Sequence, residues 1–266
     1  MKFNADILRR YISQAPVALA FERTLECEIY RSRPFASPVL DVGCGDGLFA
    51  EILFADRLDT GIDLDRDELE RARRYGKYHE LLQCEGARIP KPDASYATIF
   101  SNSVLEHIPE IEPVLREIFR LLRPGGNFYF TVPSDCFERY TVINQLIDVF
   151  GLAGISIWYR GFFNRFWKHY HCYTPEQWQT LARKSGFEIV EAFAYNPKRI
   201  CLLDDFLAPW ALPSMLLKRF AGRWVLSPAL RWIVFYPFYL IGRRVLRNGE
   251  RAEGGGLVFV HASKAR

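Results

Sequence analysis

Three closely spaced glycines form the strongest chemical signal in the sequence. Residues 39–47 read Val-Leu-Asp-Val-Gly-Cys-Gly-Asp-Gly, a short apolar run that leads into a glycine loop and then into a helical pattern. Glycines let the backbone turn tightly and approach a ligand closely, and the first N–H groups of a helix attract anionic groups. The loop therefore predicts a site for a nucleotide-like ligand. Leu48 occupies the last glycine position of the GxGxxG dinucleotide pattern, and no lysine follows the loop, which excludes a P-loop.

Two carboxylates are placed to serve the same ligand. Asp41 lies in the predicted strand before the loop, and Asp63 closes the next predicted strand. In this type of fold a carboxylate at the end of the second strand reaches ribose hydroxyls. Each residue has a simpler alternative, because Asp63 could cap a helix from Arg66 onward and Asp41 could cap the amides of the glycine loop. The two carboxylates together with the glycines favour the ligand site.

Histidines are the candidate general bases. His107 follows the fourth predicted strand, and His171 lies two residues after His169 at the end of an aromatic segment. The alternatives are that His107 fixes the start of a helix and that His171 makes only a structural hydrogen bond. The pattern His169-x-His171-Cys172 lacks an evident fourth ligand, so the sequence predicts no metal site.

The elements that position these groups alternate along the chain. Between residues 38 and 133, short apolar runs alternate with helical patterns, which is typical of parallel βαβ units. The segment Arg-Pro-Gly-Gly at residues 123–126 is expected to end a helix, and Thr174 with the following proline is expected to start one. Strands are expected at residues 39–42, 60–63, 81–84, 96–101, 128–132, 187–194 and 257–262, and helices at 48–55, 66–75, 111–122 and 174–185.

Length and composition indicate one soluble α/β domain over residues 1–266. The 266 residues are 49% hydrophobic and 25% charged, which argues against disordered, collagen-like and coiled-coil classes. Residues 1–37 are expected to form an N-terminal helical segment. The six cysteines lie far apart without a CxxC pair, so we expect a reducing compartment. Charged residues stand where a signal peptide would need an apolar core, so we expect a cytoplasmic location.

An aromatic insertion, residues 134–173, separates the fifth strand from the next helix. It holds nine aromatic residues between Phe150 and Tyr173. Insertions at the carboxyl ends of the strands cover the active-site mouth in this type of fold. We expect a lid that lines an apolar acceptor pocket, and the alternative is a buried cap.

A second insertion, residues 196–255, is apolar and basic. Ten Lys and Arg stand against Asp204, Asp205 and Glu250 in residues 196–251, a local charge of +7 in a chain of net charge +4. Tryptophan and tyrosine interleaved with arginine suit an element at an anionic membrane surface, peripheral at the inner face of the membrane. A helical subdomain that packs on the sheet or forms a dimer face has equal weight. No nucleic-acid-binding module is present in the sequence, so a nucleic-acid partner is not expected.

The same insertion is not expected to span a bilayer. Its longest uncharged runs are interrupted by Pro209, Pro213 and Pro237. A helix of eleven residues reaches about 16 Å, whereas a bilayer core measures about 30 Å.

Five ordered motifs have the spacing of a known family. They are Leu-Asp-Val-Gly-Cys-Gly-Asp-Gly (40–47), Gly-Ile-Asp (61–63), Ile-Pro with Pro-Asp-Ala-Ser (89–95), Asn-Ser-Val-Leu-Glu-His-Ile (102–108) and Leu-Arg-Pro-Gly-Gly (122–126). On these residues the chain resembles the class I S-adenosylmethionine-dependent methyltransferases, in the group with small-molecule acceptors. The resemblance implies a Rossmann-like seven-stranded sheet of order 3-2-1-4-5-7-6, with the last strand antiparallel and helices on both faces.

The resemblance also implies a role for each matching position. The glycine loop would wrap the methionine part of S-adenosylmethionine, Asp41 would support the loop, and Asp63 would bind the ribose hydroxyls. Glu85 stands where the family usually has an aspartate that accepts from the adenine amino group, and Asn102 would lie under the methionine end. The loop residues concerned are Gly43, Cys44, Gly45 and Gly47.

The function that follows is methyl transfer from S-adenosylmethionine to an apolar small-molecule or lipid-like acceptor by in-line displacement. Such a reaction needs alignment and exclusion of water more than a dedicated base. The alternative is a non-catalytic cofactor-binding module that engages a membrane or protein partner through the basic insertion.

Overall fold

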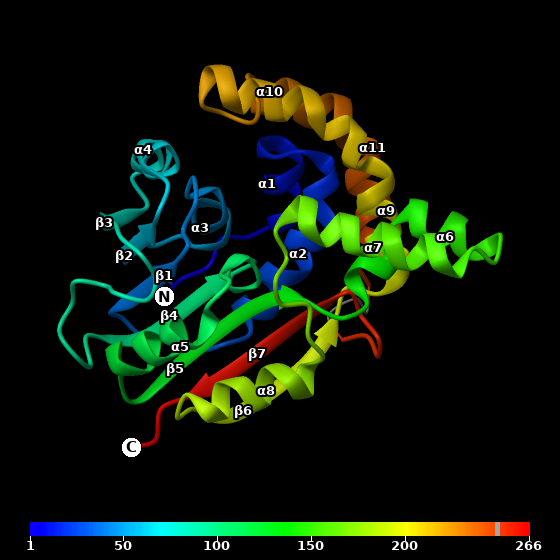
Figure 1. The fold of residues 1–266 in the computed structure, drawn as a ribbon. Helices are drawn as coiled ribbons and strands as arrows, with labels where there is room; N and C mark the ends of the chain where they lie inside the picture. The colour runs from blue at the N-terminus through cyan, green and yellow to red at the C-terminus, as the bar shows by residue number, and fades with distance from the viewer. Residues whose placement is uncertain (248–250) are drawn as a thin grey trace.

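A mixed β-sheet forms the centre of the molecule. The computed structural model describes residues 1–247 and 251–266, so residues 248–250 of the predicted 196–255 insertion lie outside the described residues. The sheet has seven strands in the order β3-β2-β1-β4-β5-β7-β6 (Figure 1). The last strand runs antiparallel to both of its neighbours, so the predicted Rossmann-like fold is confirmed. The strands are β1 (Val39–Val42), β2 (Leu58–Asp63), β3 (Tyr78–Gln83), β4 (Tyr96–Asn102), β5 (Leu122–Pro133), β6 (Glu188–Tyr195) and β7 (Leu257–Ser263).

Helices cover both faces of this sheet. On one face lie α1 (Ile7–Gln14), α2 (Val17–Arg31), α3 (Leu48–Leu53) and α4 (Arg66–Tyr75); on the other lie α5 (Ile111–Leu121) and α8 (Pro175–Lys184). Alternate residues of β5 serve the two cores, because Tyr129 packs with the first group and Phe128 and Phe130 with the second. The strands β1 to β4 run parallel to one another, so their carboxyl ends lie at the same edge of the sheet, where the candidate site residues lie.

Local sequence signals explain several element boundaries. Asp65 caps α4 by accepting hydrogen bonds from two first-turn amides, and Thr174 with Gln177 forms a capping box at α8. The expected boundary near residue 122 is wrong. Leu122 already pairs with Tyr96, so β5 begins six residues before the expected strand, and the Pro-Gly-Gly segment continues the strand with a register shift.

Helices fill the two insertions. The first contains the 3₁₀ turn η2 (Phe137–Tyr140), α6 (Val142–Val149) and α7 (Ala153–Trp167). The second contains α9 (Lys198–Leu207), the 3₁₀ turn η3 (Ala208–Ala211), α10 (Leu212–Ala221) and α11 (Pro228–Val245). Figure 1 shows α10 and α11 at the top of the molecule, away from the sheet, and α6 and α7 at one side. α11 and α9 pack mainly on the N-terminal helices α1 and α2.

The length argument against a membrane span fails. Pro209 and Pro213 occupy first-turn positions of η3 and α10, where a missing N–H costs nothing, so the helical run continues from Lys198 to Ala221. This run has 24 residues, and its most apolar 18-residue window has a mean hydropathy of 1.5 and is 33% buried. It is long and apolar enough to cross a membrane. Its first half is nevertheless part of the domain, because Ile200 and Leu207 are buried in the core.

Candidate functional site

The glycine loop between β1 and α3 is held in an unusual backbone conformation. Gly43, Gly45 and Gly47 all have positive φ angles, of 78°, 52° and 78°. A side chain at Gly43 would collide with Val104, and one at Gly47 would press on Ala72. A Cβ at Gly45 would meet no atom within 4 Å. The loop is thus closely packed on its inner side and open at Gly45, where a ligand could approach the backbone.

Asp63, at the end of β2, supports the loop directly. One carboxylate oxygen accepts the N–H of Gly45 at 2.9 Å, and the other accepts the N–H of Asp65 at 2.9 Å. The cap of α4 is Asp65, so the helix-cap alternative for Asp63 does not hold. Cys44, which also donates its amide to β2, has a buried thiol whose pKa is raised by that burial.

Asp41 pairs with a side chain of β3 that lies outside the loop. It is buried, and its carboxylate accepts a hydrogen bond of 2.7 Å from the hydroxyl of Tyr78. Burial raises the pKa of Asp41 to about 7, although the Tyr78 hydroxyl opposes the shift. Within the described residues no loop amide donates to Asp41, so the alternative in which Asp41 only caps the loop does not hold, and Asp63 accepts the Gly45 amide.

The remaining cofactor candidates follow neighbouring strands. Glu85 is exposed two residues after β3, and Asn102 is the last residue of β4. Because β3, β2, β1 and β4 are adjacent and parallel, their carboxyl ends bring Glu85, Asp63, the glycine loop and Asn102 to one edge. An open loop backbone between two carboxylates and an amide suits a cationic amino acid joined to a nucleoside, so the residues present fit S-adenosylmethionine.

The second insertion touches this loop, which the sequence did not predict. The carboxylate of Asp46, inside the glycine loop, accepts the indole N–H of Trp224 at 2.7 Å and pairs with Lys218 at 2.9 Å. Lys218 also pairs with Glu68 of α4 at 3.0 Å and stacks over the Trp224 ring. The end of α10 is therefore tied to the loop that would carry the cofactor.

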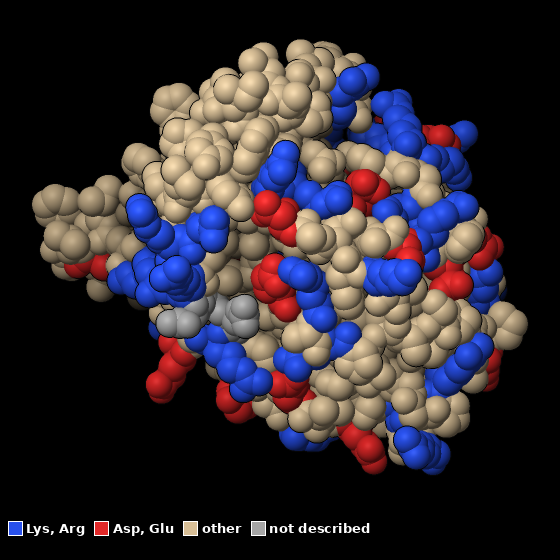
Figure 2. Space-filling view, turned by 180° about the vertical axis from the view of Figure 1, so that it is seen from behind, with Lys and Arg blue, Asp and Glu red and all other residues tan. Residues whose placement is uncertain are grey.

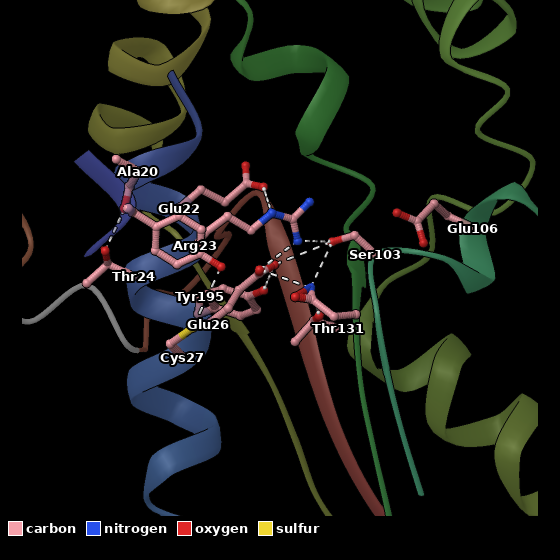
Figure 3. Close-up of polar contacts among 12 residues, drawn as sticks. Ala20, Glu22, Arg23, Thr24, Glu26, Cys27, Ser103, Glu106, Thr131 and Tyr195 are labelled. Carbon is pink, nitrogen blue, oxygen red and sulfur yellow. Dashed lines mark hydrogen bonds and ion pairs between the residues drawn. The ribbon is translucent and has the colours of Figure 1, made fainter. Parts of the chain in front are cut away.

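A buried polar cluster lies beyond the ends of β4 and β5 (Figure 3). Its centre is Glu26 of α2, which is fully buried and accepts hydrogen bonds from Tyr195 at 2.8 Å and Asn102 at 3.0 Å. Arg23, one turn earlier, pairs with Glu26 at 2.7 Å and donates to the hydroxyl of Ser103 at 2.8 Å. Helix α2 thus brings an ion pair to the edge at which Asn102 lies. We name these five residues the Arg23 cluster.

Glu106 faces the Arg23 cluster from the turn after β4. It is 1% exposed, and its Oε2 has no hydrogen-bond partner within the described residues. Figure 3 shows its carboxylate directed toward Ser103 and the Arg23 guanidinium. Burial raises the pKa of Glu106 to about 8. The sequence offered one signal for it, its place in the motif at residues 102–108, but pointed to its neighbour His107.

The two predicted catalytic histidines lie farther out. The His107 side chain is 41% exposed, its Nδ1 donates to the carbonyl of Lys168 at 3.2 Å, and its Nε2 is 3.7 Å from Glu106. His171 donates from Nε2 to the carbonyl of Ile108 at 2.9 Å and accepts at Nδ1 from Tyr173 at 3.0 Å. Both ring nitrogens of His171 are thus engaged, which matches its structural alternative.

The aromatic insertion is not a buried cap. Trp158, Phe162 and Phe166 of α7 are 63%, 47% and 65% exposed, whereas Phe163 points inward toward His169. Burial lowers the pKa of His169 to about 4, so this histidine is neutral at pH 7. Among the described residues no cluster of three or more His, Cys, Asp or Glu could hold a metal ion.

Comparisons with known proteins identify the family. A family model described as a methyltransferase domain matches residues 11–192. The ubiquinone biosynthesis O-methyltransferase of Coxiella burnetii is 31% identical over 107 residues, which cover 38% of this chain and 46% of that protein. The sterol 24-C-methyltransferase of Aspergillus fumigatus is 38% identical over 111 residues, 38% of this chain and 29% of that protein. The matches thus span less than half the length of these relatives.

Solved structures share the fold over nearly the whole chain. A methyltransferase of Thermotoga maritima, described as a possible histamine N-methyltransferase, superposes with a TM-score of 0.58 at 16% identity and covers 93% of this chain and 91% of that one. The geranyl diphosphate C-methyltransferase of Streptomyces coelicolor, solved with S-adenosylhomocysteine, has a TM-score of 0.51 at 13% identity and covers 91% and 77%. With a family model over most of its length and this sheet order, the chain belongs to the methyltransferase domain family, among the class I S-adenosylmethionine-dependent methyltransferases.

Proposed function

We propose that the protein methylates an apolar, lipid-like small molecule. The observation that carries this proposal is the arrangement at one sheet edge: an open glycine loop beside Asp63, a buried polar cluster next to it, and exposed aromatic helices around both. S-adenosylmethionine supplies a methyl group on a sulfonium centre, which is electrophilic without further activation. The chain's own contribution is to align the acceptor and exclude water.

The acceptor class is argued from the surface. Exposed large apolar side chains gather on α7, α10 and α11, and a soluble monomer rarely exposes so many together. The relatives named above act on ubiquinone precursors and sterols, which supports an acceptor of the same apolar character. The members on α10 and α11 that are at least 44% exposed are Leu212, Met215, Leu216, Phe220, Leu230, Ile233, Val234, Tyr236, Leu240 and Ile241.

We also propose that these helices rest on an anionic membrane surface, at the cytoplasmic side. Figure 2 shows the upper part of the molecule, where α10 and α11 lie, with few charged atoms, and basic side chains gathered below it. Arg243, Arg244 and Arg247 are exposed at the end of α11. Apolar insertion and attraction of arginine to anionic lipid reinforce each other in such an element. A peripheral location would give the site access to an acceptor dissolved in the bilayer.

Acceptor screening tests the activity. The protein is incubated with radiolabelled S-adenosylmethionine and a panel of extracted cell lipids, quinone precursors and sterols, with Asp63→Ala as the control of weakened cofactor affinity. We expect label in an organic-soluble product with the wild type, and less of it with Asp63→Ala when the cofactor concentration is near the wild-type Kd. If the protein binds labelled S-adenosylmethionine but transfers the methyl group to no acceptor of the panel, the non-catalytic cofactor-binding alternative is favoured instead.

Vesicle sedimentation tests the membrane proposal. We expect binding to vesicles of phosphatidylglycerol and phosphatidylcholine that high salt reduces but does not abolish. Neutralising Arg243, Arg244 and Arg247 together should weaken it. The matched control neutralises Arg116, Arg183 and Lys184, which are exposed on α5 and α8 at the opposite face of the sheet. If the wild type stays in the supernatant at low salt, the insertion is a packing or oligomer element.

A further inference from the structure

Glu106 is a buried carboxylate with one oxygen that lacks a hydrogen-bond donor among the described residues. Its side chain is 1% exposed, and Oε2 has no partner in the part of the chain that the structure describes. Leaving a buried charged or polar oxygen unpaired is costly, and folded proteins avoid it unless a ligand or a function requires it. The carboxylate is directed toward the Arg23 cluster (Figure 3). The missing donor is therefore expected from a molecule bound between Glu106 and Arg23.

Arg23 is the cation whose charge acts on Glu106 in the described part of the chain, and it is held rigidly. Its Nη1 is fixed by Glu26 and Ser103, and Glu26 is itself fixed by Tyr195 and Asn102. The Arg23 side chain is 22% exposed, whereas Glu26 is fully buried. The guanidinium is thus anchored by Glu26 and Ser103, and Glu22 lies 3.8 Å from its Nε. A donor group that cannot move is suited to stabilising charge that develops during a reaction.

The pairing of a carboxylate and a guanidinium selects the chemistry of the acceptor. A hydroxyl can donate its proton to Glu106 and, as it becomes an oxyanion, gain attraction from Arg23. An amine forms no oxyanion for Arg23 to stabilise, and an aliphatic carbon would satisfy neither group. Phenolic or enolic hydroxyls fit best because their protons are acidic enough to be taken by a carboxylate.

We propose that Glu106 and Arg23 form the binding site of the reacting hydroxyl of the acceptor, with Glu106 as its proton acceptor. This inference rests on the proposed methyltransferase function and narrows it to O-methylation. The O–H bond breaks, its proton passes to the Glu106 carboxylate, and its electron pair stays on the acceptor oxygen. That oxygen then forms the bond to the methyl carbon, while the electron pair of the broken C–S bond stays on sulfur.

The histidines of the sequence-based prediction serve this step less well. His171 uses both ring nitrogens for Ile108 and Tyr173, and the Nε2 of His107 is directed at Glu106 with 3.7 Å between them. His107 is the exposed member of the pair and is placed to pass the proton of Glu106 to solvent. We therefore assign it a supporting role that acts through Glu106 and not on the acceptor.

The first test is Glu106→Gln, with Glu110→Gln as the matched control. Glu110 lies four residues later, exposed, and its side chain caps nothing in α5. With an alkylated catechol as acceptor, Glu106→Gln should lower turnover by about 100-fold or more while the affinity for S-adenosylmethionine stays unchanged. Glu110→Gln should match the wild type. Equal turnover of Glu106→Gln and wild type would overturn the assignment.

The pH dependence gives a readout that a structural role would not produce. The groups around Glu106 are Glu22, Arg23 and Glu26 of α2, His107 beside it and Cys172 after α7. Since burial raises the pKa of Glu106 to about 8, the active carboxylate form increases as the pH rises through 8. The wild-type rate should rise across this range, and the residual rate of Glu106→Gln should rise only at the higher pH at which the free catechol itself ionises. A flat wild-type profile would contradict the role as a base.

The same pKa shift has a consequence for stability without any ligand. The folded protein keeps the Glu106 proton up to about pH 8, whereas the unfolded chain loses it near pH 4.5, so this group makes the fold less stable as the pH rises between these values. The melting temperature of Glu106→Gln should therefore fall less between pH 5 and pH 8 than that of the wild type. An identical slope would place the carboxylate in contact with solvent and remove the basis of the proposal.

Direct binding separates this inference from the proposed function. A nitrocatechol, whose phenolate is coloured, is titrated with pH on the protein saturated with S-adenosylhomocysteine. Arg23 should lower the pH of its ionisation relative to free probe by at least one unit, and Arg23→Gln should restore the free value. Should Arg23→Gln fail to fold, Ser103→Ala removes one anchor of Arg23 and should give a partial shift. An unshifted probe overturns the inference even if other acceptors are methylated.

An alkylamine of the same chain length completes the design. Transfer to the alkylated catechol and not to the alkylamine supports the inference. Transfer to the amine alone overturns it but leaves the methyltransferase function intact. If the methyl group is transferred to neither compound and to no lipid of the panel, the proposed function is overturned. The nitrocatechol titration then decides by itself whether Glu106 and Arg23 bind a hydroxyl.

Discussion

The two halves of the site are built in different ways. On the cofactor side the contacts are local, since Gly45 and Asp63 lie only 18 residues apart and the glycines shape the backbone. On the acceptor side the contacts join distant segments: Arg23 reaches Ser103 over 80 residues, and Tyr195 reaches Glu26 over 169. The first half depends on backbone conformation and the second on side chains that tertiary packing brings together. Variants should therefore affect the first half through binding and the second through folding.

Glu26→Ala should have the largest effect, on stability. Glu26 is fully buried and accepts from Arg23, Asn102 and Tyr195, so its removal takes the carboxylate from the Arg23 ion pair and leaves the Tyr195 hydroxyl without its acceptor, while Asn102 keeps Thr131. Breaking a buried pair in this way costs about 3 to 5 kcal/mol. Urea unfolding followed by circular dichroism would measure the loss.

The matched control is Glu28→Ala on the same helix. Glu28 is about one-third exposed and pairs with Arg31 at 2.8 Å, and such pairs contribute about 0 to 1 kcal/mol. Equal losses for the two variants would show that the cluster is solvated and that the contrast between the two halves is false.

Asp63→Ala should act on binding. It removes the carboxylate that accepts from Gly45 and that is expected to bind the ribose hydroxyls, which should weaken S-adenosylmethionine binding by about 1 to 3 kcal/mol in calorimetry. NAD should bind far more weakly than S-adenosylmethionine to the wild type. Asp65→Ala is the control, because it removes the cap of α4, lowers stability by about 1 kcal/mol and leaves the affinity unchanged. If Asp65→Ala weakened binding as much as Asp63→Ala, the effect would be one of folding.

The same difference explains how much the sequence could predict. The glycine loop and Asp63 follow from local patterns, because strand, turn and helix signals are each read within about ten residues. The strand order followed from the resemblance to the methyltransferase family and was confirmed. β5 was placed too late because glycine and proline in Arg-Pro-Gly-Gly suggested a turn, whereas pairing with β4 extends this segment. Tertiary pairing overrode the local preference there.

The acceptor side carried weaker signals. Glu26 and Arg23 are charged residues in a helix whose other positions are mostly buried, and only the partners Tyr195 and Asn102 reveal why. Nothing local distinguishes Glu106 from His107, because the choice depends on which of them faces α2. Likewise, the contact of Trp224 with Asp46 joins residues 178 positions apart.

Trp224→Phe tests whether the second insertion acts on the cofactor loop. The change removes the indole N–H that Asp46 accepts but keeps an aromatic ring for Lys218. We expect S-adenosylmethionine binding weaker by about 0.5 to 1.5 kcal/mol, the net value of one hydrogen bond. Trp210→Phe is the control, since Trp210 is 76% exposed in the same insertion. Unchanged affinity in both variants would make the insertion independent of the loop.

Trp158→Ala should have the smallest effect on stability. Because it leaves the fold intact, this variant tests what the exposed aromatic side chains of α7 do. Trp158 is 63% exposed and stacks on Phe162 with ring centroids 5.8 Å apart, an exposed pair one helical turn apart that contributes about 0.2 to 0.5 kcal/mol. Unfolding free energy should thus change by no more than about 0.5 kcal/mol, and S-adenosylmethionine affinity should not change, because the glycine loop lies elsewhere. Turnover with an acceptor held in vesicles should fall, since α7 presents its aromatic side chains outward. Phe163→Ala, at an inward position next to His169, should lower turnover with soluble acceptor as well. A stability loss in Trp158→Ala as large as that in Phe163→Ala would mean that α7 is packed in solution against a surface absent from the isolated chain, and that its exposed aromatics serve assembly instead of the acceptor.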